Sequence, residues 1–335
     1  MRIATLTATL LALSICLTAS LAHASNGPWK GVLVSPHHTD LMATWDHQGL
    51  YVSHNGGHHT TAVLKQRPLN VQTATWDHQN NLLIIDGHNV LHRFTQQGQH
   101  HTQALPFVLN TVALIAQPQR LVHIGEIDAV APDGDPYGPA ISISTDHGKT
   151  WTHAYTSLGD TDTQVSADAA GQIQIISAHE SGCGGGGQDR TLLNPQHPKE
   201  HSVPWPLDTA LFAPGAQGWA YGVDVCVEYE NAIQICAVSP TGAVFPIGSP
   251  NPQQFGGTFQ SAQLNDTTYI LQHQNLWKLQ GSKGTLLNNK APKDLQMLSV
   301  DAGGRPVGLV HGNVVRLNAD GSWTHLKLKI RPSKP

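Results

Sequence analysis

The chain has 335 residues, a formal net charge of −4 at pH 7, and only 13% charged residues. Lysine and arginine are spread thinly, so no basic run predicts contact with nucleic acid or with an anionic membrane surface. Beyond the N-terminal segment, no stretch approaches the roughly 20 apolar residues that a membrane-spanning helix needs. These properties predict a protein that neither binds nucleic acid nor inserts into a membrane.

Residues 1–24 are typical of a secretory signal peptide. Arg2 is the only charged residue among them, and residues 3–21 are apolar or small. Ala22 and Ala24 supply the small-x-small pattern of a cleavage site. Threonine and serine interrupt the apolar run, which favours cleavage over a membrane anchor. We therefore expect a signal peptide over residues 1–24, one mature domain over residues 25–335, and a periplasmic or secreted protein.

The mature chain contains a short internal repeat. The sequence Ala-Thr-Trp-Asp-His-Gln occurs at 43–48 and again, unchanged, at 74–79. Each copy precedes a short turn and an apolar strand, which together predict one β-hairpin. Looser copies with the same order of features follow at 114–124, 167–176, 212–221, 264–271 and 300–309. About seven units at a spacing of roughly 30 to 50 residues are typical of the blades of a β-propeller.

A turn motif lies at 144–151, where the chain matches S-x-D-x-G-x-x-W at every defined position. The defined residues are Ser144, Asp146, Gly148 and Trp151. They suit a tight turn between antiparallel strands, because the carboxylate can accept backbone N–H groups, the glycine can adopt a positive φ, and the tryptophan can cover the turn. A decayed copy at 53–60 keeps the serine and the glycine but has asparagine and threonine at the other two positions.

This motif resembles the Asp-box, the bacterial neuraminidase repeat that occurs in sialidases and in propellers similar to the photosystem stability factor. The resemblance implies an all-β fold: a single β-propeller of about seven four-stranded blades, with six blades as the alternative. It also implies a structural role for Asp146 at the outer rim of the ring. The chain shows no sustained 3.6-residue apolar period, which agrees with short strands and few helices. Ring closure is expected to pair the strand at 31–34 with residues 325–330.

Two irregular segments, 125–139 and 179–205, interrupt the repeats and are long enough to be functional loops on one face. The first carries carboxylates that are candidates for the acid or base of a glycoside hydrolase: Glu126, Asp128, Asp133 and Asp135. The alternative for these four is a solvated acidic loop. The second segment contains a glycine-rich stretch at 182–187, which lacks the ending of a phosphate-binding loop.

The sequence carries no complete catalytic constellation. Sialidases that resemble this repeat use an arginine clamp, and no arginine here lies in the Arg-Ile-Pro context of its first member. Tyr229, between Glu228 and Glu230, is expected at a hairpin turn rather than in a buried site. Asp133 and Asp135 could help hold Ca²⁺, but two carboxylates fall short of the roughly six to eight oxygen ligands that this ion takes, so we expect no cofactor. Adjacent histidines on a strand point to opposite faces, so we assign no metal site.

Three cysteines remain after removal of the signal peptide. Cys226 and Cys236 flank a predicted hairpin whose turn lies near residues 230–231. Folding this hairpin about its middle sets the two cysteines opposite each other, which in an oxidising compartment predicts a cross-strand disulfide. Cys183 is then either free or the true partner of one of them.

The sequence favours an exported, monomeric, non-enzymatic binding or scaffold protein that engages a protein or a glycan through loops on one face. The alternative is a glycoside hydrolase or lyase that acts on extracellular polysaccharide, with the four carboxylates as its candidate acid and base. A third hypothesis is binding of Zn²⁺ or Cu²⁺ by the histidines, of which the chain has 21. The fold does not distinguish these functions, because one architecture serves all of them.

Overall fold

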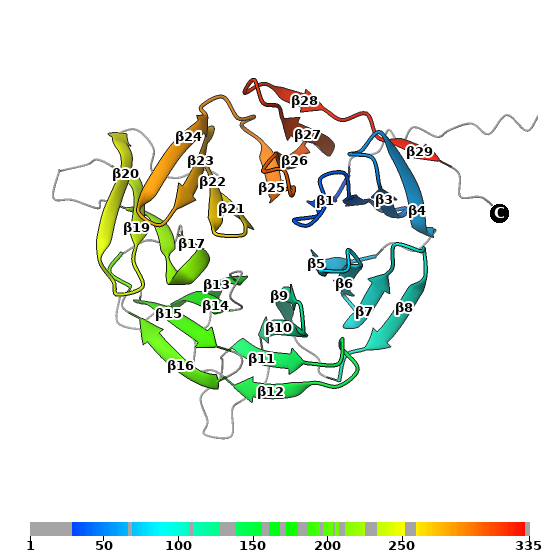
Figure 1. Cartoon of the computed structure of the whole chain (residues 1–335), viewed down its shortest axis with the longest axis horizontal. Coiled ribbons are helices and arrows are strands. Elements are labelled where there is room, and N and C mark those ends of the chain that lie inside the picture. The colour runs from blue at the N-terminus through cyan, green and yellow to red at the C-terminus, as the bar shows by residue number, and fades with distance from the viewer. Residues whose placement is uncertain are drawn as a thin grey trace, which may run out of the picture.

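The computed structural model describes residues 29–65, 69–106, 110–126, 139–155, 161–167, 172–179, 187–194, 197–203, 205–207, 212–224, 233–251 and 259–331. These residues form seven sheets arranged as blades around a central axis (Figure 1), which confirms an all-β propeller of seven four-stranded blades. The only helix in this part of the chain is a single 3₁₀ turn, η1 (Ala216–Gly218). No helix among the described residues is long and apolar enough to cross a membrane.

The first three blades follow one another along the chain. Blade 1 contains β1 (Gly31–Val34), β2 (Met42–Trp45), β3 (Gly49–Ser53), β4 (His59–Lys65) and the C-terminal β29 (Lys329–Arg331). Blade 2 contains β5 (Val71–Trp76), β6 (Leu82–Asp86), β7 (Val90–Phe94) and β8 (His100–Ala104). Blade 3 contains β9 (Asn110–Gln117), β10 (Arg120–Glu126), β11 (Pro139–Ser144) and β12 (Thr152–Tyr155).

The remaining four blades repeat this order. Blade 4 contains β13 (Thr161–Ala167), β14 (Ile173–His179), β15 (Gly187–Asn194) and β16 (His197–Val203). Blade 5 contains β17 (Phe212–Pro214), β18 (Ala220–Asp224), β19 (Ile233–Val238) and β20 (Val244–Asn251). Blade 6 contains β21 (Phe259–Leu264), β22 (Thr267–Gln272), β23 (Asn275–Gln280) and β24 (Lys283–Asn288). Blade 7 contains β25 (Leu295–Val300), β26 (Pro306–Val310), β27 (Asn313–Leu317) and β28 (Trp323–His325).

Alternating strand direction gives the ring two different faces. The first strand of each blade lies nearest the axis and the fourth lies outside (Figure 1). We call one of the two faces the turn face: the first strand of each blade ends there, as β1 does at Val34 and β5 at Trp76. The connections from first to second strands and from third to fourth strands therefore lie on the turn face. The loop face is where second strands end, as β2 does at Trp45; second-to-third connections and the links between blades leave from it. Function can therefore differ between the two faces.

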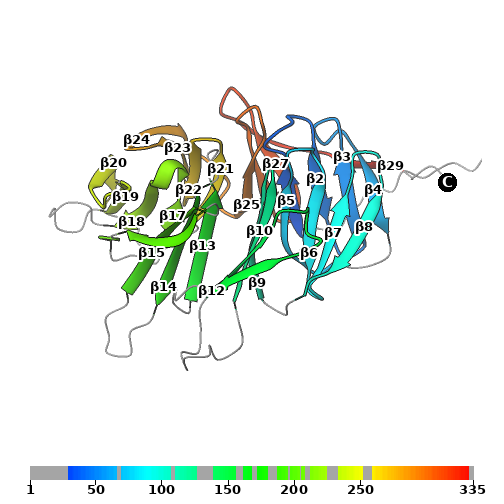
Figure 2. The ribbon, with the colours of Figure 1, turned by 60° about the horizontal axis from the view of Figure 1, so that its bottom comes forward.

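The core lies between neighbouring blades rather than at the axis. Trp45 of blade 1 packs with Trp76 and Ile84 of blade 2, and equivalent clusters lie at the other blade junctions. Figure 2 shows neighbouring blades side by side around the ring. Because each sheet is covered on both sides, middle strands such as β6 are buried along their whole length and read as continuous apolar runs. Gly31 lies against the Trp45 ring, and any Cβ there would overlap it.

The two identical hexapeptides occupy different places in their blades. Residues 43–48 complete β2 and turn into β3 at the loop face, whereas residues 74–79 complete β5 and begin the turn to β6 at the turn face. The looser copies all span a first-to-second connection, at 114–124, 167–176, 212–221, 264–271 and 300–309. In blade 1 the repeat is therefore displaced by one strand from its place in the other blades, so the expected equivalence of the two copies is wrong. The reason is that an aspartate turn depends on its own residues and can join any two antiparallel strands.

Ring closure also differs from the expectation. β1 pairs with β2, and β29 pairs in parallel with β4, the outer strand, placing Ile330 opposite Thr60. The predicted pairing of 31–34 with 325–330 is wrong, although both segments contribute to one sheet. The physical reason is the path of the chain: it leaves blade 7 from the outer strand β28, so the outer edge of blade 1 is within reach and the inner strand is not.

The expected loop at 179–205 contains two strands, β15 and β16, and only residues 180–186 separate β14 from β15. Most residues of β15 and β16 are polar, so these strands lack the alternation of apolar and polar residues by which a strand is predicted from sequence. The other expected loop, 125–139, is confirmed as a connection between strands, because β10 ends at Glu126 and β11 begins at Pro139. The connections 127–138 and 180–186 join second to third strands of blades 3 and 4, so both leave from the loop face.

The hairpin of blade 5 has a different register from the one predicted. Cys236 is fully buried in β19 and lies opposite Gly222 of β18, rather than opposite position 226. Cys226 and Cys183 lie outside the described residues. The disulfide between Cys226 and Cys236 therefore stays a prediction.

Candidate binding site

A cavity of about 450 Å³ lies beside the central channel, toward the loop face. This volume is within the range of roughly 300 to 1,000 Å³ that is typical of ligand sites. The wall combines the beginnings of β1 and β5 with the middle of β25, so three blades meet there. Most of the lining side chains are apolar, among them Val32, Trp45, Leu69, Val71, Met297 and Leu298. The cavity can therefore hold an apolar group near the axis of the ring.

Met297 is held in this wall by an irregularity of β25. The register of β25 against β26 shifts between Gln296 and Ser299, and Met297 has a φ of 54°. A positive φ is uncommon in residues other than glycine, and both bulges and strained residues concentrate at functional sites. The side chain is 41% exposed. Because methionine adapts to irregular apolar surfaces, this position can contact partners of varied shape.

The opposite end of the channel has a cavity of about 350 Å³ at the turn face, where inner strands of blades 1 to 4 and 6 end. His37 and His78 line it, and their ring centroids are 4.4 Å apart with the rings tilted by 33°. Each ring is positioned by a tight turn. The His37 N–H donates to Ser35 Oγ at 3.0 Å, and Asp77 Oδ1 accepts the N–H of Gln79 at 2.9 Å.

The electrostatics of this pair favour the neutral form of His37. Burial lowers the pKa of His37, and the neighbouring His78 lowers it further, while Asp77 acts in the opposite direction. The His37 imidazole is therefore uncharged at neutral pH. Its protonation at lower pH places a positive charge beside a second histidine in the mouth of the channel.

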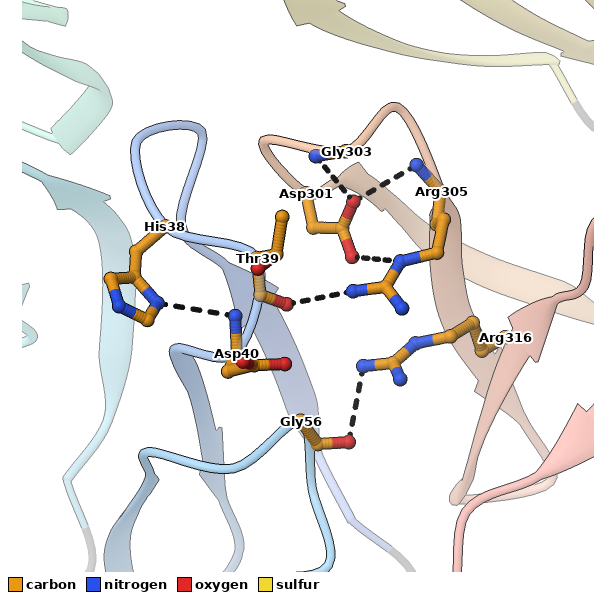
Figure 3. A network of polar contacts seen from close by, with 8 residues as sticks. All are labelled: His38, Thr39, Asp40, Gly56, Asp301, Gly303, Arg305 and Arg316. Carbon is orange, nitrogen blue, oxygen red and sulfur yellow. Dashed lines mark hydrogen bonds and ion pairs between the residues drawn. The ribbon is translucent and has the colours of Figure 1, made fainter.

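A polar network joins the last blade to the first on the same face (Figure 3). Arg305 Nε donates to Asp301 Oδ2 at 2.7 Å, and its Nη2 donates to the carbonyl oxygen of Thr39 at 3.0 Å. Arg316 Nη2 donates to the carbonyl oxygen of Gly56 at 3.1 Å. Both guanidinium groups belong to blade 7 and both carbonyls to blade 1. The network therefore joins blade 7 to blade 1, where the two ends of the propeller meet, and we call it the clasp.

Charge within the clasp is only partly balanced. Burial lowers the pKa of Arg316, and the nearby Arg305 lowers it further, whereas Asp301 and Asp40 oppose the shift. Arginine nevertheless stays protonated. Since both guanidinium groups donate to blade 1, we assign the clasp a structural role.

Residues 144–151 form a turn in the third-to-fourth connection of blade 3. Ser144 Oγ accepts the N–H of Gly148 at 2.7 Å, and Asp146 accepts the N–H and the hydroxyl of Thr150 at 2.8 and 2.7 Å. These hydrogen bonds lower the pKa of Asp146 to about 2. Trp151 packs into the cluster between blades 2 and 3. The side-chain oxygens of Ser144 and Asp146 thus accept hydrogen bonds from within the turn, whereas the carbonyl oxygen of Lys149 accepts one from Gln103 Nε2 of blade 2 at 3.1 Å.

The decayed copy lies at the equivalent connection of blade 1. Ser53 Oγ accepts the N–H of Gly57 at 2.9 Å, and Asn55 Oδ1 accepts the N–H of His59 at 2.8 Å. Both turns are also held by an arginine from the third strand of the preceding blade. Arg93 Nη2 donates to the carbonyl oxygen of His147 at 3.0 Å, as Arg316 does to that of Gly56, and both carbonyls belong to the fourth residue of the motif.

The candidate acid and base residues are not brought together by any described contact. Glu126 ends β10, and its side chain lies outside the described part of the structure. Asp128, Asp133 and Asp135 lie outside the described residues altogether. Within the described residues, no group of three or more histidine, cysteine, aspartate or glutamate side chains can hold a metal ion.

Sequence reasoning missed both cavities and the clasp. Met297 has no local signal, because its bulge is visible only in the pairing of β25 with β26. His37 has no local signal either, because its neighbour in space, His78, belongs to the next blade. Arg305 follows an aspartate turn similar to the repeat, which was a usable signal for its contact with Asp301.

No protein family model and no curated protein sequence matches this chain. Its fold is similar to the tricorn protease, with a TM-score of 0.61 and 12% identity over 91% of this chain and 34% of that chain. It is also similar to puromycin hydrolase, with a TM-score of 0.59 and 11% identity over 94% of this chain and 56% of that chain. A structure of YCF48 bound to D1 peptide matches with a TM-score of 0.49 and 13% identity over 87% of this chain and 95% of that chain.

These comparisons bear on architecture only. The chain spans about a third of the tricorn protease chain and somewhat more than half of the puromycin hydrolase chain. At such low sequence identity, the structural likeness shows a shared propeller fold, and it carries no information about activity.

Proposed function

We propose that this chain is an exported binding or scaffold protein that engages a protein or a glycan through its loop face. The observation that carries the proposal is that a cavity and three connections between strands occur on the same face. The apolar cavity with the exposed Met297 lies toward the loop face, and the connections 127–138, 180–186 and 225–232 leave from it in three successive blades. The cavity belongs to blades 1, 2 and 7 and the three connections to blades 3, 4 and 5, so both are available to a partner that covers this face.

The alternative function, a glycoside hydrolase or lyase, uses the same face. Its candidate residues are Glu126, Asp128, Asp133 and Asp135, which follow or end β10. A glycosidase needs two carboxylates on either side of the scissile bond. No described contact assembles such a pair, so we rank this function second.

The first experiment is affinity capture from the native cell envelope and medium, with the mature chain immobilised and partners identified by mass spectrometry. We expect a stoichiometric partner that is lost from the Met297→Glu variant, because a carboxylate in the apolar cavity is costly to desolvate. It should also be lost when residues 127–138 are replaced by an Asn-Gly turn. The matched control is Gln97→Glu, an exposed position in a turn at the other face, which should capture normally.

The outcome decides between the candidates. A partner that binds the Met297→Glu variant and the shortened variant normally contradicts the loop-face assignment. An empty capture directs the search to glycans, by binding to immobilised polysaccharides with the same variants. Depolymerisation of a polysaccharide that disappears when the four carboxylates are changed to amides would instead establish the enzyme.

A further inference from the structure

The outer strand of blade 6 differs from the outer strands of blades 2 and 7. β24 is exposed along nearly its whole length and carries two consecutive exposed leucines, Leu286 at 42% and Leu287 at 36%. By contrast, β8 of blade 2 presents histidine, threonine and glutamine, and β28 of blade 7 is short. β24 pairs with β23 on one side, and no described strand pairs with its other edge. Such an apolar edge is a template for another extended chain.

Blade 1 shows what an outer edge of this ring accepts. β29 adds to β4 in parallel as a fifth strand, with Ile330 opposite Thr60. β4 and β24 occupy the same rank, the fourth strand, in their blades. A fifth strand is therefore compatible with this blade architecture.

The surroundings of β24 are positively charged, although the whole chain has a net charge of −4. Residues 275–295 contain four exposed lysines, Lys278, Lys283, Lys290 and Lys293. The only acidic residue in this stretch is Asp294, which pairs with His311 at 3.1 Å. None of the four lysines forms an ion pair with another described residue. The charge at this edge therefore calls for an acidic partner.

Apolar surface continues from β24 toward blade 5. The backbone of β24 at Gly284 lies against Ile247 of β20. On the same strand, Phe245 is 38% exposed, and its ring lies 5.7 Å from that of Trp219. A segment that binds along β24 thus meets apolar groups of two blades.

We propose that the outer edge of β24 binds an extended segment of a partner protein as a fifth strand of blade 6. The segment alternates apolar and acidic residues. Main-chain hydrogen bonds supply the affinity, while the leucines and lysines select the side chains. The edge lies on the rim of the ring, away from the cavity at the loop face, and the inference does not rest on the proposed function.

The test uses the mature chain and a fluorescein-labelled peptide of about ten alternating valine and glutamate residues, long enough to pair along a whole strand. Fluorescence anisotropy measures binding, and hydrogen exchange locates it. We expect binding that protects amides of residues 283–288. The same peptide with N-methyl groups at alternate residues, and a valine–lysine peptide, should bind at least about tenfold more weakly, because they lose main-chain donors or charge complementarity.

Variants of the chain complete the test. The double variant Leu286→Gln, Leu287→Gln should bind the valine–glutamate peptide at least about tenfold more weakly, because it loses apolar contacts without adding charge. Thr102→Gln, an exposed position on the outer strand β8, is the matched control, and thermal unfolding verifies that both variants fold. The proposal is overturned by absence of binding, by equal binding of the N-methylated peptide, by protection elsewhere, or by indifference to the double variant. Met297→Glu should leave this binding unchanged, which separates the two proposals.

Discussion

The turn at 144–151 of blade 3 and its decayed copy at 53–60 of blade 1 form similar hydrogen bonds with different side chains. Asp146 accepts two hydrogen bonds from Thr150, whereas Asn55 accepts one from the backbone of His59. The side-chain oxygen of the third motif residue therefore accepts a hydrogen bond in both turns, but it belongs to a charged carboxylate in blade 3 and to a neutral amide in blade 1. What they have in common is the serine, a short side-chain acceptor two residues later, and the glycine.

The last position of the motif differs for a reason that lies outside the turn. In blade 3, Trp151 packs into the cluster between blades 2 and 3. In blade 1 the equivalent residue is Thr60, which is buried and lies opposite Ile330 of the C-terminal strand β29. In blade 1, the C-terminal segment that ends in β29 covers the turn, as Trp151 covers the turn in blade 3. The comparison teaches that the turn is a local device, whereas its covering depends on the neighbouring chain.

The largest expected effect comes from the glycines of the two turns. Gly148 has a φ of 94°, and a Cβ there would lie 2.8 Å from Leu91 Cδ2; for Gly57 the values are 91° and 3.0 Å from Leu328 Cδ2. Alanine at either position combines backbone strain of about 1–2 kcal/mol with overpacking of about 1–3 kcal/mol. Urea unfolding should show Gly148→Ala as the more destabilising, because Leu91 is fixed in a strand.

The matched control for this prediction is Gly98→Ala in blade 2. Gly98 has a φ of 80° and no atom within 4 Å of the added Cβ. This variant should lose only the strain contribution. Equal losses in Gly98→Ala and Gly148→Ala would contradict a role for packing against Leu91.

A smaller and nearly equal effect is expected from the two serines. Both are buried, and each accepts the N–H of its glycine. Ser53→Ala and Ser144→Ala each leave that N–H without its acceptor, at a cost of about 1–3 kcal/mol in the free energy of unfolding. Urea unfolding checks this, with the exposed Ser282→Ala as control. Markedly unequal losses would show that the two turns are not equivalent.

The smallest effect is a dependence on pH that the turn of blade 3 should show and the turn of blade 1 should not. Hydrogen bonds lower the pKa of Asp146 to about 2 in the folded chain, below its ordinary value of 3.8. The stabilisation by this carboxylate is complete above pH 3.8 and is lost as the pH falls toward 2. In Asp146→Asn, the melting temperature should therefore fall less steeply with acid than in the wild type. The Asn55→Asp variant should add a second acid-sensitive turn, and identical pH profiles would refute the assignment.

Much of the fold followed from local patterns. Short alternating strands, turns rich in glycine and aspartate, and a repeated unit predicted a seven-bladed all-β ring, and the structure confirms it. In the turn at 144–151, the carboxylate acceptor and the positive φ of the glycine were predictable, because both act within the motif, whereas the hydrogen bond that Ser144 accepts was not predicted. Strands β15 and β16 escaped notice because their pairing supports polar sequences that carry no apolar alternation.

The candidate sites were harder to predict because their residues are distant in the chain. The cavity near Met297 combines β1, β5 and β25, and the contact of Arg316 with Gly56 joins positions 260 residues apart. The exposed edge at Leu286 depends on the rank of β24 in its sheet. None of these relations has a sequence pattern of its own.

The hexapeptides at 43–48 and 74–79 separate what the sequence determined by itself from what only the tertiary structure decided. Both turns have the same internal hydrogen bond, in which the aspartate accepts the N–H of the residue two positions later, at 2.7 Å for Asp46 and 2.9 Å for Asp77. That hydrogen bond depends on neighbouring atoms and follows from the residues alone. Which strands the turn connects, and which face it occupies, depend on packing between blades, because burial of the Trp45 ring against Gly31 and of Trp76 in the same cluster is decided only when the ring assembles.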